Sequence, residues 1–191
     1  WVSQTIPLGA LPARTYGETF QLPATASSGL TVSYSASGAC SVAGNFVQPT
    51  GLGTCTITAN QAGDATYFAA PQQVQAFAVA SASQGITFGT APAGVTVGQP
   101  LVMVGATSGS ATAPPSTLPI VFSSLTPGIC TTGGINGASL TLLAEGLCTI
   151  EANQAGDGNY GATSQTQSFT VGAAGAPPAT FTVTNLNDSG A

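Results

Sequence analysis

The stretch "GTCTITANQAGDATY", residues 53–67, returns as "GLCTIEANQAGDGNY" at residues 146–160. Each copy has a cysteine at its third position and ends on a tyrosine. The match also extends outward, because "SQTIPLG" (Ser3–Gly9) resembles "SQGITFG" (Ser83–Gly89) at a spacing of 80 residues. Self-similarity over such a period is typical of a chain built from repeated structural units.

Two repeats account for most of the chain. They fill residues 1–79 and 80–172, and we expect residues 173–191 to hold a linker and the first strand of a following module. The spacing between matched residues grows from 80 to 93 along the chain, so the second repeat contains insertions. The largest insertion lies in the Pro-, Ser- and Thr-rich segment 107–119, which we expect to be a loop.

Alternation at period two predicts strands in both repeats. In Thr54–Ala59 the residues Cys55, Ile57 and Ala59 share one face, whereas the threonines share the other. Glu151 points outward in the second copy of this strand. Gly and Pro interrupt the sequence every 8–12 residues, as in β-sandwiches. The predicted fold class is therefore all-β, with two tandem sandwiches joined by a short linker.

The "NQAGD-x-x-Y" part of the phrase predicts a tight turn, because Gly tolerates positive φ and Asp can bond nearby main-chain amides. Asp64 and Tyr67 form this turn in the first repeat, and Asp157 and Tyr160 form it in the second. The tyrosine hydroxyl is expected to bond a neighbouring main-chain group. A calcium site at the turn is the alternative, but each turn offers one carboxylate, whereas calcium takes six to eight oxygen ligands. We predict no metal.

The cysteines fall two per repeat. An even number in equivalent places predicts one disulfide inside each repeat, joining Cys40 to Cys55 and Cys130 to Cys148. Separations of 15 and 18 residues close loops worth roughly 3 kcal/mol each. We do not expect a zinc site, because the sequence has neither a C-x-x-C pair nor a histidine. We also do not expect a redox-active pair, because no cationic residue lies nearby in the sequence to stabilise a thiolate. Disulfides favour an exported protein, extracellular or on the cell surface.

Charge is scarce in this chain. Charged residues make up 4%, Arg14 is the single basic residue, and the net charge is −5. We expect no nucleic-acid partner, because almost nothing could neutralise phosphates. We expect no membrane insertion, because apolar runs stay far below the roughly 20 residues of a spanning helix. Trp1 is not an initiator residue, so we expect a segment of a longer chain.

The pattern "SSGLTVSYS…C…GTCTITANQAGDATY…VQAFAV" resembles the bacterial immunoglobulin-like repeats of very large secreted and surface proteins. The resemblance covers both repeats and rests on the SSG-L turn, the cysteine pair, the Asp–Tyr turn and the closing "F-x-V" strand. It implies an immunoglobulin-like sandwich that serves as a spacer, stalk or adhesin segment. The tyrosine of the turn is similar to the tyrosine corner of that fold.

The tail "ATFTVTNLNDSGA" (Ala179–Ala191) follows a Gly-, Ala- and Pro-rich linker and resembles the opening of a right-handed β-helix domain. Such a segment could instead be a flexible stub, or could add to the sheet edge of a neighbour. Asn187 fits a glycosylation sequon, which often arises by chance.

Enzymatic chemistry is not expected. Nucleophilic catalysis at serine needs a base, and the chain has no His or Lys. Glu145, in the turn before the predicted strand that carries Glu151, lies six residues from it, but extended chain separates the two acids by about 20 Å, too far to act on one bond. The predicted catalytic residues and cofactors are therefore none.

Two binding functions remain as alternatives to a spacer. Trp1, Tyr16, Phe46 and Phe68 could line a carbohydrate site, although their scatter in the sequence favours core or edge positions. The charge-poor strands could instead pair with other copies of the chain and form a filament or sheath. Expected partners are thus other copies, neighbouring domains of the same long chain, or surface glycans.

Overall fold

Short strands separated by glycine- and proline-containing turns build the chain. The computed structural model describes residues 1–100, 102–111 and 113–175. Within these residues the regular structure is β, apart from a single 3-10 turn, so the all-β prediction is confirmed. Most of the predicted segment 173–191, including the β stub and Asn187, lies outside the described residues.

The first repeat contains β1 (Arg14–Thr15), β2 (Phe20–Gln21), β3 (Ser33–Gly38), β4 (Cys40–Ala43), β5 (Phe46–Pro49), β6 (Gly53–Asn60) and β7 (Gln73–Ala80). The second contains β8 (Gly85–Phe88), β9 (Val102–Met103), β10 (Ala106–Gly109), β11 (Ile120–Ser124), β12 (Cys130–Gly133), the 3-10 turn η1 (Ile135–Gly137), β13 (Ser139–Leu142), β14 (Gly146–Gln154) and β15 (Thr163–Val171).

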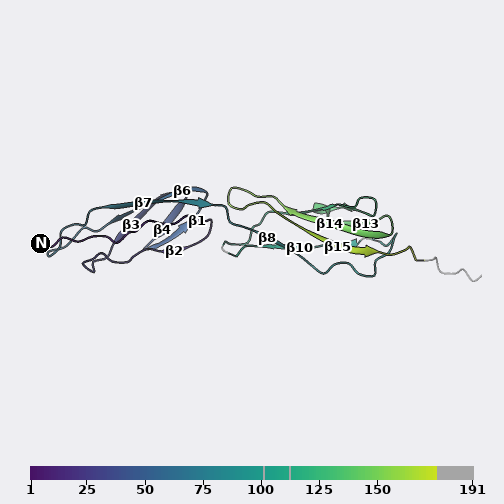
Figure 1. Cartoon of the computed structure of the whole chain (residues 1–191), viewed down its shortest axis with the longest axis horizontal. Coiled ribbons are helices and arrows are strands. Elements are labelled where there is room, and N and C mark those ends of the chain that lie inside the picture. The colour runs from purple at the N-terminus through teal and green to yellow at the C-terminus, as the bar shows by residue number, and fades with distance from the viewer. Residues whose placement is uncertain (101, 112, 176–191) are drawn as a thin grey trace, which may run out of the picture. The chain divides into compact units, whose positions relative to one another are not determined.

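Two sheets form in the first repeat. One has the order β1-β7-β6-β3, in which β6 and β7, both labelled in Figure 1, pair antiparallel. The other has the order β2-β5-β4. Val47 from the second sheet and Ile57 from the first are both fully buried in a single apolar cluster. Two sheets that share one core make a β-sandwich.

The second repeat has a matching pair of sheets, ordered β11-β14-β15 and β12-β13-β9, and a separate two-stranded ribbon of β8 and β10. Leu140 and Leu142 of β13 are buried, as are Ile150 of β14 and Val171 of β15. In the described residues, each strand pairs only with strands of its own repeat.

Packing divides the chain into two compact units. Unit 1 comprises Trp1–Gly89, Gly105–Val121 and Ala152–Gln165. Unit 2 comprises Thr90–Val104, Phe122–Glu151 and the residues from Thr166 on. The predicted division into consecutive domains, 1–79 and 80–172, stays a prediction.

The alternation of faces agrees with the sequence pattern. Cys55, Ile57 and Ala59 are fully buried on β6, and Cys148, Ile150 and Ala152 are buried on β14. The predicted loop at 107–119 was wrong at its start, because β10 takes in Thr107 to Gly109 by pairing with β8. Ser, Thr and Gly resemble a loop in composition, and only the partner strand makes this segment a strand.

Candidate functional site

Each repeat contains one disulfide that joins its two sheets. Cys40 of β4 is bonded to Cys55 of β6, with their Cα atoms 5.4 Å apart. Cys130 of β12 is bonded to Cys148 of β14, with a Cα separation of 5.7 Å. All four cysteines are buried, and the described residues contain no free thiol. A buried cross-link between sheets limits how far the two layers can separate when the repeat is stressed.

The repeated phrase folds into the same hydrogen-bonded turn in both copies. The N–H of Asp64 donates to the carbonyl oxygen of Tyr67 at 3.0 Å, and that of Asp157 donates to Tyr160 at 2.9 Å. The Oδ1 atom of each aspartate accepts the main-chain N–H groups two and three residues on, at 2.7 and 2.8 Å. The aspartate therefore organises the turn through main-chain contacts.

A glycine precedes each aspartate because the backbone passes very close to it. A Cβ atom on Gly63 would lie 2.4 Å from the carbonyl oxygen of Tyr67, and one on Gly156 would lie 2.5 Å from that of Tyr160. Real Cβ atoms do not approach main-chain oxygen so closely, so the close contact alone accounts for both glycines.

The turn holds the chain segment that enters each repeat. Val2 pairs in parallel with Tyr67, and Ala82 pairs in parallel with Tyr160. The N–H of Ala82 donates to the carbonyl oxygen of Asn159 at 2.9 Å, and Ala82 is fully buried. The repeated phrase thus fixes the first residues of the repeat against its last hairpin.

Two buried glutamines strengthen this attachment. Nε2 of Gln4 donates to the carbonyl oxygen of Phe68 at 2.6 Å, and Nε2 of Gln84 donates to the carbonyl oxygen of Gly161 at 2.7 Å. The sequence repeats "SQ" at both positions, but that pattern alone gave these residues no role. Their role becomes visible only once the entering segment lies beside the turn.

The two tyrosines of the turn differ in their surroundings. Tyr67 is half-buried, whereas Tyr160 is buried and its hydroxyl donates to the carbonyl oxygen of Pro114 at 2.6 Å. Within unit 1 the Tyr160 ring also meets the ring of Tyr16 edge-on, with centroids 5.5 Å apart. Burial raises the pKa of the Tyr160 phenol, and Tyr16 and Asp157 add to this rise.

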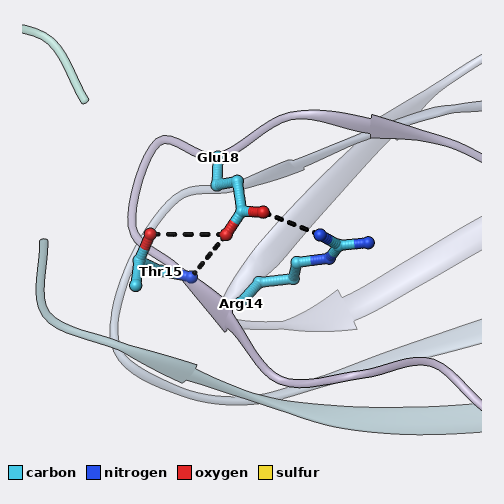
Figure 2. A network of polar contacts seen from close by, with 3 residues as sticks. All are labelled: Arg14, Thr15 and Glu18. Carbon is cyan, nitrogen blue, oxygen red and sulfur yellow. Dashed lines mark hydrogen bonds and ion pairs between the residues drawn. The ribbon is translucent and has the colours of Figure 1, made fainter. Parts of the chain in front are cut away.

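A second repeated turn was missed at the level of sequence. Figure 2 shows Oε2 of Glu18 accepting the N–H of Thr15 at 3.2 Å, while Oε1 accepts from the Arg14 guanidinium at 2.7 Å. The Thr15 amide, followed by Arg14, holds the pKa of the Glu18 carboxyl below its usual value. The guanidinium of Arg14 also lies 4.6 Å from the centre of the Phe20 ring.

The same turn recurs in the second repeat without the charges. The N–H of Thr96 donates to Oε1 of Gln99 at 3.2 Å, and Gly98 has a φ of 78°, against 79° at the equivalent Gly17. The signal in the sequence is "T-x-G-[E/Q]" at residues 15–18 and 96–99, a spacing of 81. Two identical residues and one similar residue are too weak a match to be recognised as a repeated turn from the sequence, before the backbone structure is known.

The described residues do not assemble an evident reaction centre. They contain no group of three or more His, Cys, Asp or Glu side chains that could hold a metal ion. Glu145 precedes β14 and Glu151 lies within it, so the structure leaves them on separate elements. Trp1, Phe46 and Phe68 are more than half exposed, so of the core or edge positions expected from the sequence, the core is excluded for these three.

No protein-family model and no curated protein sequence matches the chain. Among solved structures it is similar to the S-layer protein rSbsC and to domains 1–6 of the surface layer protein SbsC, each with a TM-score of 0.41 and 15% identity over 91% of this chain. It is also similar to the EC1–4 segment of Drosophila N-cadherin, with a TM-score of 0.37 and 12% identity over 91% of this chain. The chain spans 27% of each surface-layer structure and 50% of the cadherin structure. At these values the likeness identifies neither a family nor a function.

Proposed function

We propose that the chain is a load-bearing structural segment, a stalk or spacer, of an exported surface protein. The observation that carries this proposal is the parallel pairing of an early segment with the C-terminal end of each repeat: the last strand in the first repeat, and the residue directly after the last strand in the second. β1 pairs with β7 through Arg14 with Val79 and Thr15 with Ala80. In the second repeat, Thr96 pairs in parallel with Gly172.

Parallel pairing determines how a repeat responds to tension along the chain. The early strand is pulled towards the N-terminus and the last strand towards the C-terminus. Two parallel neighbours then slide past each other, so their inter-strand hydrogen bonds resist together. An antiparallel hairpin pulled from its two open ends would lose its bonds one at a time. The geometry therefore favours mechanical resistance.

The hydrogen bonds of this pairing continue into the second repeated turn. The N–H of Tyr16 donates to the carbonyl oxygen of Ala80 at 2.9 Å, and the N–H of Val97 donates to that of Gly172 at 3.1 Å. The disulfides add a second limit, because the chain between the paired cysteines cannot extend even in an unfolded repeat.

The connection between the repeats contains almost no free chain. β7 ends at Ala80, and Ala82 is already buried and hydrogen-bonded to the turn of the second repeat. Only Ser81 lies between them. Neighbouring domains of the same long chain are the proposed partners of such a spacer. The disulfides support an oxidising, extracellular location, and the described residues include no helix long and apolar enough to cross a membrane.

Single-molecule force spectroscopy on the oxidised chain tests the proposal. Tyr16 and Val97 each occupy the second position of a turn with Gly at positive φ next, a position that favours proline. Tyr16→Pro and Val97→Pro should therefore keep the turn but remove the N–H that donates to the last strand. Val97→Pro should lower the unfolding force of the second repeat alone. Tyr16→Pro should lower that of the first repeat, and it also removes the ring contact with Tyr160 of the second repeat. If neither variant changes the unfolding force, the paired parallel segments do not resist the load in shear. If the wild-type repeats open without measurable resistance, the chain has no load-bearing role.

Lateral self-association is a second candidate. β3 (Ser33–Gly38) lies at one edge of its sheet and contains neither charge nor proline, the features that usually block edge pairing. Sedimentation velocity of the chain and of Ser35→Lys tests it. Concentration-dependent association that the lysine abolishes would support pairing at β3. A monomer at every concentration would contradict it.

A further inference from the structure

The two repeats are in contact within unit 1, beside the end of β7. The ring of Tyr16, in the charged turn drawn in Figure 2, packs edge-on against the buried Tyr160 of the second repeat, with ring centroids 5.5 Å apart. A Cβ atom on Gly17, the next residue of that turn, would lie 2.9 Å from the Cα atom of Ala113. Ala82, which pairs with Tyr160, is fully buried. The charged turn of the first repeat therefore covers the Asp–Tyr turn of the second.

The equivalent surface of the first repeat is exposed and apolar. The N–H of Phe68 donates to the carbonyl oxygen of Val2 at 3.0 Å. This bond has its counterpart in the second repeat between Gly161 and Ala82, also at 3.0 Å. Phe68 is 52% exposed and Val2 is 54% exposed, and the ring of Trp1, a residue 75% exposed, lies 5.1 Å from that of Phe68. These three residues form one exposed surface, which we call the Trp1 face.

The uncharged counterpart of the turn, in the second repeat, is also uncovered. Val97 holds the place of Tyr16, and Gly98 holds that of Gly17. A Cβ atom on Gly98 would meet nothing within 4 Å, in contrast to one on Gly17. Gln99 is exposed and uncharged, so an apolar surface that covered this turn would desolvate no charge. The chain thus has both halves of the contact between its repeats a second time, each of them exposed.

The sizes of the side chains are exchanged between the covered contact and the exposed surfaces. In the covered contact the large side chain, Tyr16, lies on the turn, and the residues equivalent to the two aromatic residues of the Trp1 face are Ser81 and Gly161. At the exposed surfaces the large rings lie on the face, and the turn carries the smaller Val97. A specific interface needs side chains of complementary size. The small turn and the large face are complementary in the same way as the large turn and the small face.

We propose that the Trp1 face binds the turn around Val97 and Gly98 of a second copy of this chain, so that copies associate end to end. The contact repeats between two copies the arrangement that Tyr16 and Tyr160 have inside one chain. Because the face and the turn are different surfaces, a pair of copies keeps one free surface of each kind and can extend into an open filament. This contact is independent of the load-bearing role and of pairing at the β3 edge, since it uses neither the parallel strand pair nor a sheet edge.

Trp1 is the only tryptophan of the chain, so its fluorescence reports directly on this face. We would follow the full chain from about 1 μM to about 1 mM, the range of dissociation constants expected for a small interface. As the concentration rises, the emission should move to shorter wavelength, acrylamide should quench it less, and the sedimentation coefficient should increase in step. Ser35→Lys, which blocks the β3 edge, should change none of this. A monomer at every concentration, as expected if another kind of domain occupies the face, would overturn the proposal, and so would association without a change in Trp1 emission.

An exchange of side-chain sizes provides the decisive comparison. Val97→Tyr enlarges the turn, and Trp1→Ser with Phe68→Gly reduces the face, so each change alone should weaken association by about tenfold or more. The triple variant should regain it, because its turn and face then match the covered contact. The fold should be kept, since the other repeat carries the introduced residues at the equivalent positions. Ile135→Ser is the control, because Ile135 is 86% exposed and lies on neither surface. A triple variant that associates no better than Val97→Tyr, or an equal loss in Ile135→Ser, would overturn the assigned surfaces.

Discussion

Asp64 and Tyr67 bond to each other twice: the N–H of Asp64 donates to the carbonyl oxygen of Tyr67 at 3.0 Å, and the Asp64 carboxylate accepts the N–H of Tyr67 at 2.8 Å. This reciprocal pair closes the turn without a long-range contact. It therefore explains why the phrase is repeated as a unit.

Removal of the carboxylate should loosen this turn. Asp64→Ala loses two hydrogen bonds to main-chain amides and should cost about 1–2 kcal/mol of local stability, whereas Asp64→Asn keeps an acceptor oxygen and should cost less. Hydrogen exchange at the Tyr67 amide measures the effect, and the Tyr160 amide serves as the control. Asp157→Ala should reverse the two responses. Equal exchange at Tyr67 in the Ala and Asn variants would contradict the role given to the carboxylate.

The glycines of the two turns should tolerate no side chain. Gly63→Ala and Gly156→Ala would place Cβ atoms 2.4 and 2.5 Å from main-chain oxygen, so the hairpin must shift. We expect losses above about 2 kcal/mol each. Gly158→Ala is the matched control, because a Cβ atom there meets nothing within 4 Å and should change stability little. Urea denaturation followed by NMR signals of each repeat separates the effects. A Gly63→Ala variant as stable in urea as the wild type would contradict the close contact between Gly63 and the carbonyl oxygen of Tyr67.

The sequence was informative where one short segment determines its own structure. The Asp–Tyr turn and the alternation along Thr54–Ala59 depend on neighbours within a few residues, and the structure shows both. The pairing of Cys40 with Cys55 was also accessible, because equivalent cysteines recur in each repeat.

The rest depends on contacts between distant segments. Gln84 lies 71 and 77 residues before the carbonyl groups to which it donates. Its neighbours in sequence therefore do not indicate that it attaches the entering segment to the turn. β10 becomes a strand through β8, and its Ser, Thr and Gly residues otherwise resemble a loop. Phe46 and Phe68 are more than half exposed although both are strongly hydrophobic, and the neighbouring residues in sequence do not indicate this.

The contact between Ser28 and Gln4 should be measurable against the second repeat. Ser28→Ala removes both the bond to Gln4 and the bond to the Leu30 amide, whereas Ser116→Ala removes only the equivalent bond to Leu118. The first change should therefore cost about 1 kcal/mol more than the second. Urea denaturation with repeat-resolved NMR signals measures the difference. Equal losses would show that Ser28 contributes nothing through Gln4.

Reduction of the disulfides should lengthen the extension released when each repeat unfolds under force. While the cross-links are intact, the chain between the bonded cysteines cannot extend, and the separations are 15 residues in the first repeat and 18 in the second. At the reach of an extended chain, reduction should add about 50 Å and about 60 Å to the two events. Force spectroscopy with and without reductant tests this, and Cys40→Ser/Cys55→Ser should show the added length in one event only. Extensions that do not change on reduction would contradict both cross-links.

The charged turn of the first repeat should respond to acid, whereas its uncharged counterpart should not. In the folded chain the pKa of Glu18 is lowered by the Thr15 amide and by Arg14. The unfolded state therefore binds protons first, and the stabilisation is complete above the ordinary glutamate pKa of about 4.3 and lost as pH falls through the lower folded value. The side chain is 34% exposed, so the ion pair contributes less than about 1 kcal/mol.

The amide shift of Thr15, followed against pH by NMR, reports this titration directly. Its midpoint should lie below the ordinary glutamate value, and Glu18→Gln should abolish it. The variant should still close the turn, because Gln99 accepts the Thr96 amide at 3.2 Å in the second repeat. The Thr96 amide supplies the internal control and should show no such midpoint. A Thr15 midpoint at or above the ordinary value would mean that the contacts in Figure 2 do not favour the charged carboxylate in solution.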